Sequence, residues 1–226
     1  MRKLSILQNQ VSYIGLFTRP TFTLWGEGQK ILQGLYDAFS SYKVSLADFR
    51  HDSSSQVPAD QSVVVGLSPT LVYKFKLDRI ETVMSAFTDQ ELDQFPEVMS
   101  KGTVWIRSAA PEFAFQTHLF TYHCHSKLSE GTATEFLRGL SQTNFEIPGV
   151  GLGNGIIFNW IESEREQRIQ LTVDHSHVYP EALFLHFTLQ DSTDLIDYGE
   201  ALKSGKALLT TALERMGLEF EAEEQG

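Results

Sequence analysis

Leu71-Val72-Tyr73-Lys74-Phe75-Lys76-Leu77 is the stretch of this chain that most strongly decides its fold. Large apolar residues alternate with valine and lysine, which is typical of an antiparallel strand with one buried face. A second stretch, Leu183-Phe184-Leu185-His186-Phe187-Thr188-Leu189, has the same alternation, and each stretch follows a proline by two or three residues. The two stretches therefore predict antiparallel sheet in both halves of the chain.

The patterns around these strands predict an α+β fold made of two similar halves, residues 1–110 and residues 111–226. The first half is expected to contain a strand over 11–22, a helix over 27–39, strands over 42–49, 62–67 and 71–77, and a helix over 89–99. Residues 103–108 are either a further strand or the end of that last helix. The second half is expected to contain a strand over 113–126, a helix over 131–141, a hairpin of 156–161 with 168–173, a strand over 182–189, and a helix over 194–216.

Each half then has the order β-α-β-β-β-α, with the helices packed on one face of an antiparallel sheet. We expect an internal duplication with a pseudo-twofold arrangement, in which the halves either share one continuous sheet or pack as a pseudo-dimer. The alternative is two unrelated α+β stretches with similar patterning, because strand alternation alone produces such matches.

The charge of the chain is strongly unbalanced. The 226 residues carry a formal net charge of −11; residues 113–226 have 7 Lys and Arg against 17 Asp and Glu. Nucleic-acid surfaces need clustered lysine and arginine, so nucleic acid is an unlikely partner, and so is an anionic membrane surface. The acidic tail, residues 219–226, is expected to be solvated and frayed.

The single cysteine, Cys124, excludes an intrachain disulfide and is consistent with a reducing compartment. The apolar residues 4–7 are too few for a signal peptide, and no stretch approaches the length of a membrane span. We therefore expect a soluble, cytoplasmic protein. Cys124 is expected to be a small core residue rather than a nucleophile, because Phe120 and Tyr122 share its strand face.

Two His-x-His pairs are the clearest candidates for chemistry: His123 with His125, and His175 with His177. In a strand, residues i and i+2 point to one face, so each pair presents two imidazoles side by side. Four imidazoles could bind one transition metal, if the two strands are neighbours. The alternatives are histidines that pack on aromatic rings, or a histidine cluster that binds a substrate or senses pH.

Other residues near the pairs are candidates for lining a ligand site: Tyr122, Gly151, Gly153, Asp174 and Tyr179. The glycine-rich run over 149–155 differs from G-x-G-x-x-G and has no Walker lysine, so it does not predict a phosphate loop. Glycines can still let a ligand approach the backbone closely.

No motif assigns a reaction, so whether the protein is an enzyme stays open. The sequence favours a binding or interaction module whose partner is a protein or a small-molecule ligand. The alternative is a metal-binding protein or metal-dependent enzyme that uses the His-x-His pairs, with a transition metal as its cofactor. Nucleic-acid binding ranks third, because the basic stripe Lys74, Lys76 and Arg79 is its only support. The oligomeric state is left open by the sequence.

Overall fold

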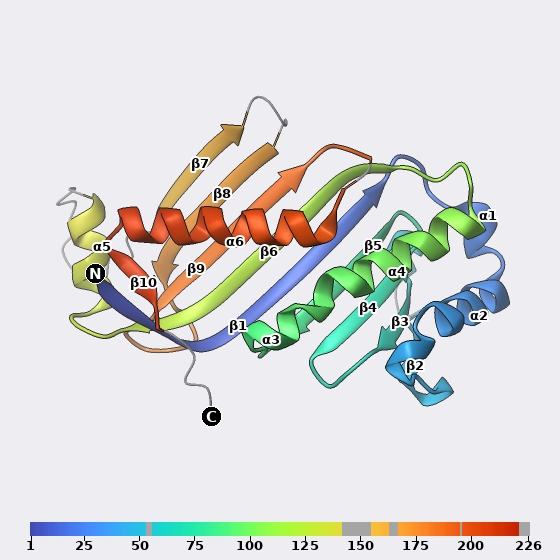
Figure 1. Cartoon of the computed structure of the whole chain (residues 1–226), viewed down its shortest axis with the longest axis horizontal. Coiled ribbons are helices and arrows are strands. Elements are labelled where there is room, and N and C mark those ends of the chain that lie inside the picture. The colour runs from blue at the N-terminus through green and yellow to red at the C-terminus, as the bar shows by residue number, and fades with distance from the viewer. Residues whose placement is uncertain (53–55, 142–154, 163–166, 195, 222–226) are drawn as a thin grey trace. The chain divides into compact units, whose positions relative to one another are not determined.

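The chain has an α+β fold with a large antiparallel sheet and a few helices, which confirms the predicted class (Figure 1). The computed structural model describes residues 1–52, 56–141, 155–162, 167–194 and 196–221. Two compact units are present: unit 1 comprises residues 1–10, 121–189 and 203–226, and unit 2 comprises residues 11–120 and 190–202. The predicted boundary at residue 110 concerns the repeats rather than these units, and it stays a prediction.

Unit 2 contains most of the first half of the chain. Its elements are β1 (Arg2–Phe17, residues 11–17 in this unit), α1 (Phe22–Trp25), α2 (Gly28–Ala38), β2 (Phe49–Asp52), β3 (Ser62–Gly66), β4 (Leu71–Lys76), β5 (Arg79–Ser85), α3 (Asp89–Leu92), α4 (Gln94–Ala109) and the first part of β6 (Phe115–Leu128). The strands follow the order β2-β3-β4-β5-β1-β6 within the unit, and β2 to β5 form an antiparallel meander.

The core of unit 2 lies between the sheet and α4. Tyr73 and Phe75 of β4 are fully buried, as their alternation with lysine predicts. The Phe75 ring meets Trp105 of α4 edge-on, with 5.3 Å between ring centroids. Gly102 of α4 lies against the ring of Tyr73, so the helix axis comes close to the strand at this point. Helix α4 therefore covers β4 and β5 on one face (Figure 1).

The strand predicted over 42–49 is wrong. Residues 40–42 and 46–48 form two 3-10 turns, and Leu46, which was expected to point inward, is 81% exposed. Two local signals outweigh the alternation. Lys43 takes a left-handed conformation with φ of 56°, and the Asp48 carboxylate accepts bonds from the backbone N–H and hydroxyl of Ser45. Such short side-chain bonds to the backbone compete with strand formation.

Strand β5 has no counterpart among the sequence predictions, which leave residues 78–88 unassigned. Ile80, Thr82 and Met84 are buried, and the alternating Arg79 and Glu81 pair with each other on the opposite face. Residues 103–108 continue α4 and do not form a strand. The helix predicted over 89–99 is divided into the short α3 and the start of α4. Pro96 lies in the first turn of α4, where proline is tolerated.

Unit 1 contains the other end of β1 and β6 together with α5 (Ala133–Ser141), β7 (Ile156–Glu162), β8 (Gln167–His175), most of β9 (Leu183–Asp191), most of α6 (Tyr198–Arg215) and β10 (Leu218–Phe220). Its strands follow the order β1-β6-β9-β8-β7. The predicted hairpin is confirmed as seven antiparallel pairs of β7 with β8. Gly217 ends the α6 segment with φ of +75°, as its place in the sequence predicts.

One face of the unit 1 strands is covered by helices. Leu185, Phe187 and Leu189 of β9 are buried, and Gly205 of α6 lies next to Phe187 and Leu189. Figure 1 shows α6 in front of these strands. The alternate residues of β6 and β9 point the other way, to a face that no described helix covers. We call this the uncovered face of unit 1.

The two ends of the chain differ from the predictions. Strand β1 begins at Arg2, nine residues before the predicted start at Val11, and ends at Phe17. Glu219 and Phe220, expected to be frayed, form part of β10 and pair in parallel with Lys3 and Leu4. Leu218 is fully buried, so apolar burial orders the start of the acidic tail. Residues 222–226 lie outside the described residues.

The internal duplication is not confirmed. Four strands, β2 to β5, lie between the helices of the first half, whereas three described strands, β7 to β9, lie between those of the second. The strand that directly precedes the long helical stretch is β5 in the first half and β9 in the second. The two similar stretches of sequence, residues 71–77 and 183–189, instead match β4 with β9. No described helix is both long enough and apolar enough to cross a membrane.

Candidate functional site

The uncovered face of unit 1 gathers three histidines. His123 and His125 lie on β6, and His186 lies on the neighbouring strand β9. The rings of His123 and His186 are nearly parallel, at 5°, with 6.3 Å between centroids. Phe184, also on β9, lies 5.1 Å from the His125 ring and 5.9 Å from the His123 ring. We call these four residues the histidine–phenylalanine cluster.

Strand alternation explains why these side chains meet. On β6 the buried Cys124 separates His123 from His125, and on β9 the buried Leu185 separates Phe184 from His186. Adjacent side chains on neighbouring strands lie about 5 Å apart, so two i, i+2 pairs form a compact group. The predicted direction of the first His-x-His pair is therefore confirmed, and so is the burial of Cys124.

Hydrogen bonds fix two of the three imidazoles. The Nδ1 atom of His125 lies 2.8 Å from the hydroxyl of Ser176, and the Nε2 atom of His186 lies 3.1 Å from the hydroxyl of Thr188. Ser176 also accepts bonds from the backbone N–H groups of Val178 and Tyr179. The imidazole of His123 makes only ring contacts with described residues. Its two nitrogens can therefore bond to a partner.

Burial keeps the cluster uncharged near neutral pH. Desolvation lowers the pKa of His123, and the neighbouring His186 and His125 lower it further because two positive charges would repel. Burial likewise lowers the pKa of His125 and of His186. The uncovered face thus presents neutral aromatic rings, which cost less to desolvate than charged ones when a partner covers them.

The second His-x-His pair is placed differently from the first. His175 ends β8, and β9 lies between β8 and β6, so the two pairs are not on neighbouring strands. Ser176, the residue between His175 and His177, is the one that reaches His125. Among the described residues, no group of three or more His, Cys, Asp and Glu side chains could hold a metal ion. The transition-metal site of four histidines stays a prediction.

The other candidate residues are dispersed. Tyr179 joins the cluster: its ring meets that of His125 at 5.5 Å, and its hydroxyl donates to the side chain of Gln8. Asp174 accepts a bond from the backbone N–H of His175 and lies against Gly155. Tyr122 alternates with His123, and its ring contacts Phe220 of β10. Gly151 and Gly153 lie outside the described residues.

Sequence reasoning missed His186, Phe184 and Ser176 as members of the site. The signal was present, since the strand Leu183–Leu189 places Phe184 and His186 on the face opposite to its leucines. What was absent is the information that β9 lies next to β6, because the strand order is not encoded in alternation.

A second polar group is buried in unit 2. The hydroxyl of Tyr13 lies 2.8 Å from Nδ1 of His118 and 3.2 Å from the hydroxyl of Tyr198, which in turn lies 2.7 Å from the hydroxyl of Thr103. Tyr13 and His118 are fully buried. Desolvation raises the pKa of Tyr13 and of Tyr198 and lowers that of His118, so every member of this chain is neutral. The Nε2 atom of His118 is buried without a hydrogen-bond partner among the described residues. A buried, neutral network of this kind supports a structural role rather than a catalytic one.

A further feature of unit 2 is the set of hydrogen bonds that Asp194 accepts. Asp194 accepts bonds from the backbone N–H of Phe115, at 2.7 Å, and from the guanidinium of Arg107, at 3.0 Å. These bonds lower the pKa of Asp194 even though its partial burial acts in the opposite direction. The pair thereby ties the loop after β9 to the start of β6 and to α4. The described contacts of Asp194 are with protein groups alone.

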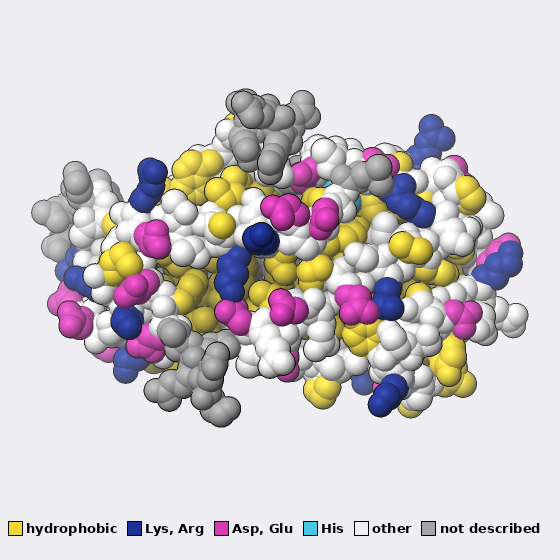
Figure 2. Space-filling view, in the orientation of Figure 1, with side chains coloured by type: hydrophobic (Ala, Val, Ile, Leu, Met, Phe, Trp, Pro, Cys, Tyr) yellow, Lys and Arg dark blue, Asp and Glu magenta, His cyan; other side chains and the backbone are white. Residues whose placement is uncertain are grey.

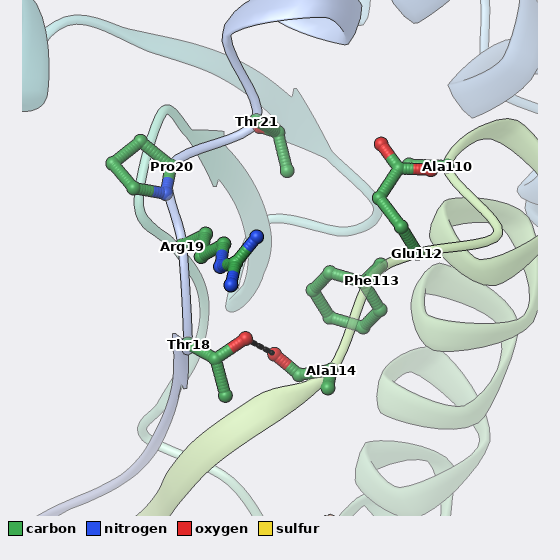
Figure 3. A pocket seen from close by; sticks show the side chains of 8 residues that line it. All are labelled: Thr18, Arg19, Pro20, Thr21, Ala110, Glu112, Phe113 and Ala114. Carbon is green, nitrogen blue, oxygen red and sulfur yellow. Dashed lines mark hydrogen bonds between the residues drawn. The ribbon is translucent and has the colours of Figure 1, made fainter.

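The chain also carries open pockets. One of about 440 Å³ in unit 2 is lined by residues 18–21, 110 and 112–114 (Figure 3). Figure 3 shows the Arg19 side chain pointing into it, while the hydroxyl of Thr18 donates to the carbonyl of Ala114. In unit 1, apolar residues of β7, β8 and α6 line a pocket of about 380 Å³, and residues of α5 with Met1 and Arg2 line another of about 490 Å³. The histidine–phenylalanine cluster lines none of these three pockets.

The chain matches no family model and none of the curated proteins with which it was compared. Its function must therefore be inferred from its own residues.

The lowered histidine pKa values predict how stability depends on pH. Between the folded pKa of these histidines and their ordinary value of 6.5, the unfolded chain binds protons that the folded chain does not. The free energy of unfolding is therefore expected to fall as the pH drops below about 6.5 and to be fully retained above it. His118 is fully buried, so a His118→Gln variant is expected to lose less stability on acidification.

Urea unfolding of both proteins at about pH 7.5 and about pH 5.5 measures this difference, and the loss in wild type is expected to be the larger. An equal loss in the two proteins would contradict the assignment to His118.

Proposed function

We propose that the protein is a binding module whose partner is an extended segment of another protein, held on the uncovered face of unit 1. The observation that carries the proposal is the histidine–phenylalanine cluster: four rings in mutual contact on a sheet face that no described helix covers. Aromatic side chains are enriched at protein interfaces because they contribute much contact area at a small entropic cost.

The chemistry of the cluster supports a partner that offers both apolar and hydrogen-bonding groups. Each neutral imidazole has one donor and one acceptor nitrogen, and His123 uses neither with a described residue. Gln8 and Tyr179 add an amide and a hydroxyl at the border of the cluster. The formal net charge of −11 further favours a partner segment with basic side chains, since complementary charge speeds association.

The position of the cluster on a sheet face supports a protein partner over a small molecule. Small ligands bind in concave sites that enclose most of their surface. The cluster lines none of the three pockets described above. A protein segment needs no such enclosure, because it can lie along the strands.

A displayed library of random peptides tests the proposal. Peptides are selected on wild type and then measured on a Phe184→Ser/His186→Ser variant and on a Thr210→Ala variant, whose exposed side chain is on α6, away from the uncovered face. The first variant is expected to weaken binding by at least about tenfold, and the second to leave it unchanged. Equal binding by all three proteins would overturn the proposal. Thermal unfolding of each variant confirms that it is folded.

We also propose that the chain arose by internal duplication. The support is the order of its elements: a long strand, a helix, a set of antiparallel strands and a long helix occur twice, as β1, α2, β3 to β5 and α4, and as β6, α5, β7 to β9 and α6. Under this proposal β2 is an addition to the first half, and β5 corresponds to β9.

A further inference from the structure

We propose that two copies of this chain associate through β7, which pairs antiparallel with the β7 strand of the second copy about a twofold axis at Asn159. This proposal is independent of the binding function above. It rests on three observations: β7 is an edge strand, its edge lacks protective features, and its sequence is self-complementary about Asn159.

Strand β7 lies at the end of the strand order in unit 1, and among the described residues it is hydrogen-bonded to β8 alone. Its pairing with β8 is regular from Ile156 to Glu162, without a bulge. An edge of this kind carries a row of unpaired backbone N–H and C=O groups, which can form a ladder with another strand.

Monomeric proteins protect such edges with charges, prolines, bulges or short length. Strand β7 contains no proline, and its only charged residue is Glu162, at its last position. Strand β2, which ends the order in unit 2, is different: it has four residues, and Arg50 and Asp52 are among them. Charges like those within β2 are therefore missing from positions 156–161, the part of β7 that surrounds Asn159.

Several large apolar side chains of β7 are exposed to solvent. Ile157 is 59% exposed, Ile161 73% and Trp160 41%. The rings of Phe158 and Trp160 stack nearly parallel, at 13° and 5.8 Å. Figure 2 shows hydrophobic side chains open to solvent over β7 on the face that carries the helices. Both faces of this strand thus expose apolar surface, which is a mark of an interaction site.

Self-complementarity identifies the second copy as the occupant. In an antiparallel pair centred on Asn159, Ile157 faces Ile161 of the second copy, Phe158 faces Trp160, and Asn159 faces itself. The twofold axis, perpendicular to the sheet, keeps each side chain on its own face, so isoleucine meets isoleucine on one face and aromatic meets aromatic on the other. Cross-strand pairs of these kinds are the stabilising ones in antiparallel sheets.

Sedimentation equilibrium tests the proposal with two matched variants. Ile161→Lys places a charge at the paired edge, and Val104→Lys makes the same change at a 69% exposed position of α4. Wild type is expected to reach twice its 25.5 kDa mass. Ile161→Lys is expected to raise the dissociation constant by at least about tenfold, and Val104→Lys to leave it unchanged.

A cysteine cross-link tests the pairing register of the two β7 strands. Asn159→Cys is expected to form a disulfide-linked dimer under oxidising conditions, because the two positions face each other within the reach of a disulfide. Arg168→Cys, on β8, is expected to stay unlinked. A wild type that is monomeric at the highest concentration reached would overturn the proposal, as would a dimer that Ile161→Lys does not weaken or that Asn159→Cys does not link.

Discussion

Replacing Gly102 with alanine is expected to lower the free energy of unfolding by about 1–2 kcal/mol. A Cβ atom at Gly102 would lie 2.5 to 2.7 Å from three atoms of the Tyr73 side chain, well inside contact distance. Tyr73 is fully buried, and its ring lies against Phe39 at 4.9 Å, so it has no free space to move into. Overpacking of this kind costs about 1–3 kcal/mol and occasionally more, and the gain in helix propensity offsets only about 1 kcal/mol.

Gly139→Ala is the matched control for this substitution. Gly139 is also in a helix, α5, but it is exposed and nothing lies within 4 Å of an added Cβ. Alanine there is expected to raise the free energy of unfolding by about 0.5–1 kcal/mol, because glycine loses more conformational freedom on folding. Urea unfolding of the two variants measures both changes. The same sign for both would contradict the close packing of α4 on β4.

Tyr13→Phe is expected to lower the free energy of unfolding by about 1–3 kcal/mol, although it removes a single oxygen atom. The hydroxyl of Tyr13 connects His118 to Tyr198 in the buried chain of unit 2. Without this oxygen, Nδ1 of His118 loses its bond inside a core that excludes water, and Tyr198 retains only Thr103. The cost is that of an unpaired buried polar group, since the change in ring volume is small.

Tyr36→Phe provides the comparison for Tyr13→Phe. Tyr36 is 40% exposed, and its ring packs against Phe49, so loss of its hydroxyl is expected to change stability by less than about 0.5 kcal/mol. The two variants differ in burial and bonding, not in the chemical change. Equal effects in thermal and urea unfolding would show that the buried hydrogen bonds of Tyr13 do not contribute to stability.

Much of the fold could be predicted from local patterns. The alternation in 71–77 and 182–189 identifies strands whose large apolar residues are buried as predicted, and the predicted strand over 62–67 is present as β3. The predicted helix over 131–141 begins with a Thr132–Glu135 capping box. Such features depend on neighbours in sequence, so they are visible without the tertiary structure.

The failures of prediction have physical causes outside the local pattern. Residues 42–49 alternate like a strand, but the Ser45–Asp48 bonds produce a turn. The Arg79–Glu81 pair gives β5 a polar appearance, although its other face is buried. The start of the tail is ordered because β10 finds a partner in residues 2–4, far away in sequence. None of these partners can be identified from hydrophobic periodicity alone.

In the candidate site too, the local features could be predicted from the sequence and the contacts between strands could not. The first His-x-His pair shares one face, as the period of a strand predicts. The contact of that pair with His186 and Phe184 depends on β6 and β9 being neighbours, and the strand order is a property of the whole sheet. A site formed by both His-x-His pairs depends on where their strands lie in the sheet, and β9 lies between β6 and β8.

The most direct test of the account is to locate a bound partner segment on the protein. Hydrogen–deuterium exchange is measured with and without the strongest peptide selected from the displayed library. The account predicts slower exchange in the unit 1 part of β6, residues 121–128, and in residues 183–189 of β9. Slower exchange confined to α5, α6 or β7, with β6 and β9 unchanged, would contradict the claim that the uncovered face is the binding surface.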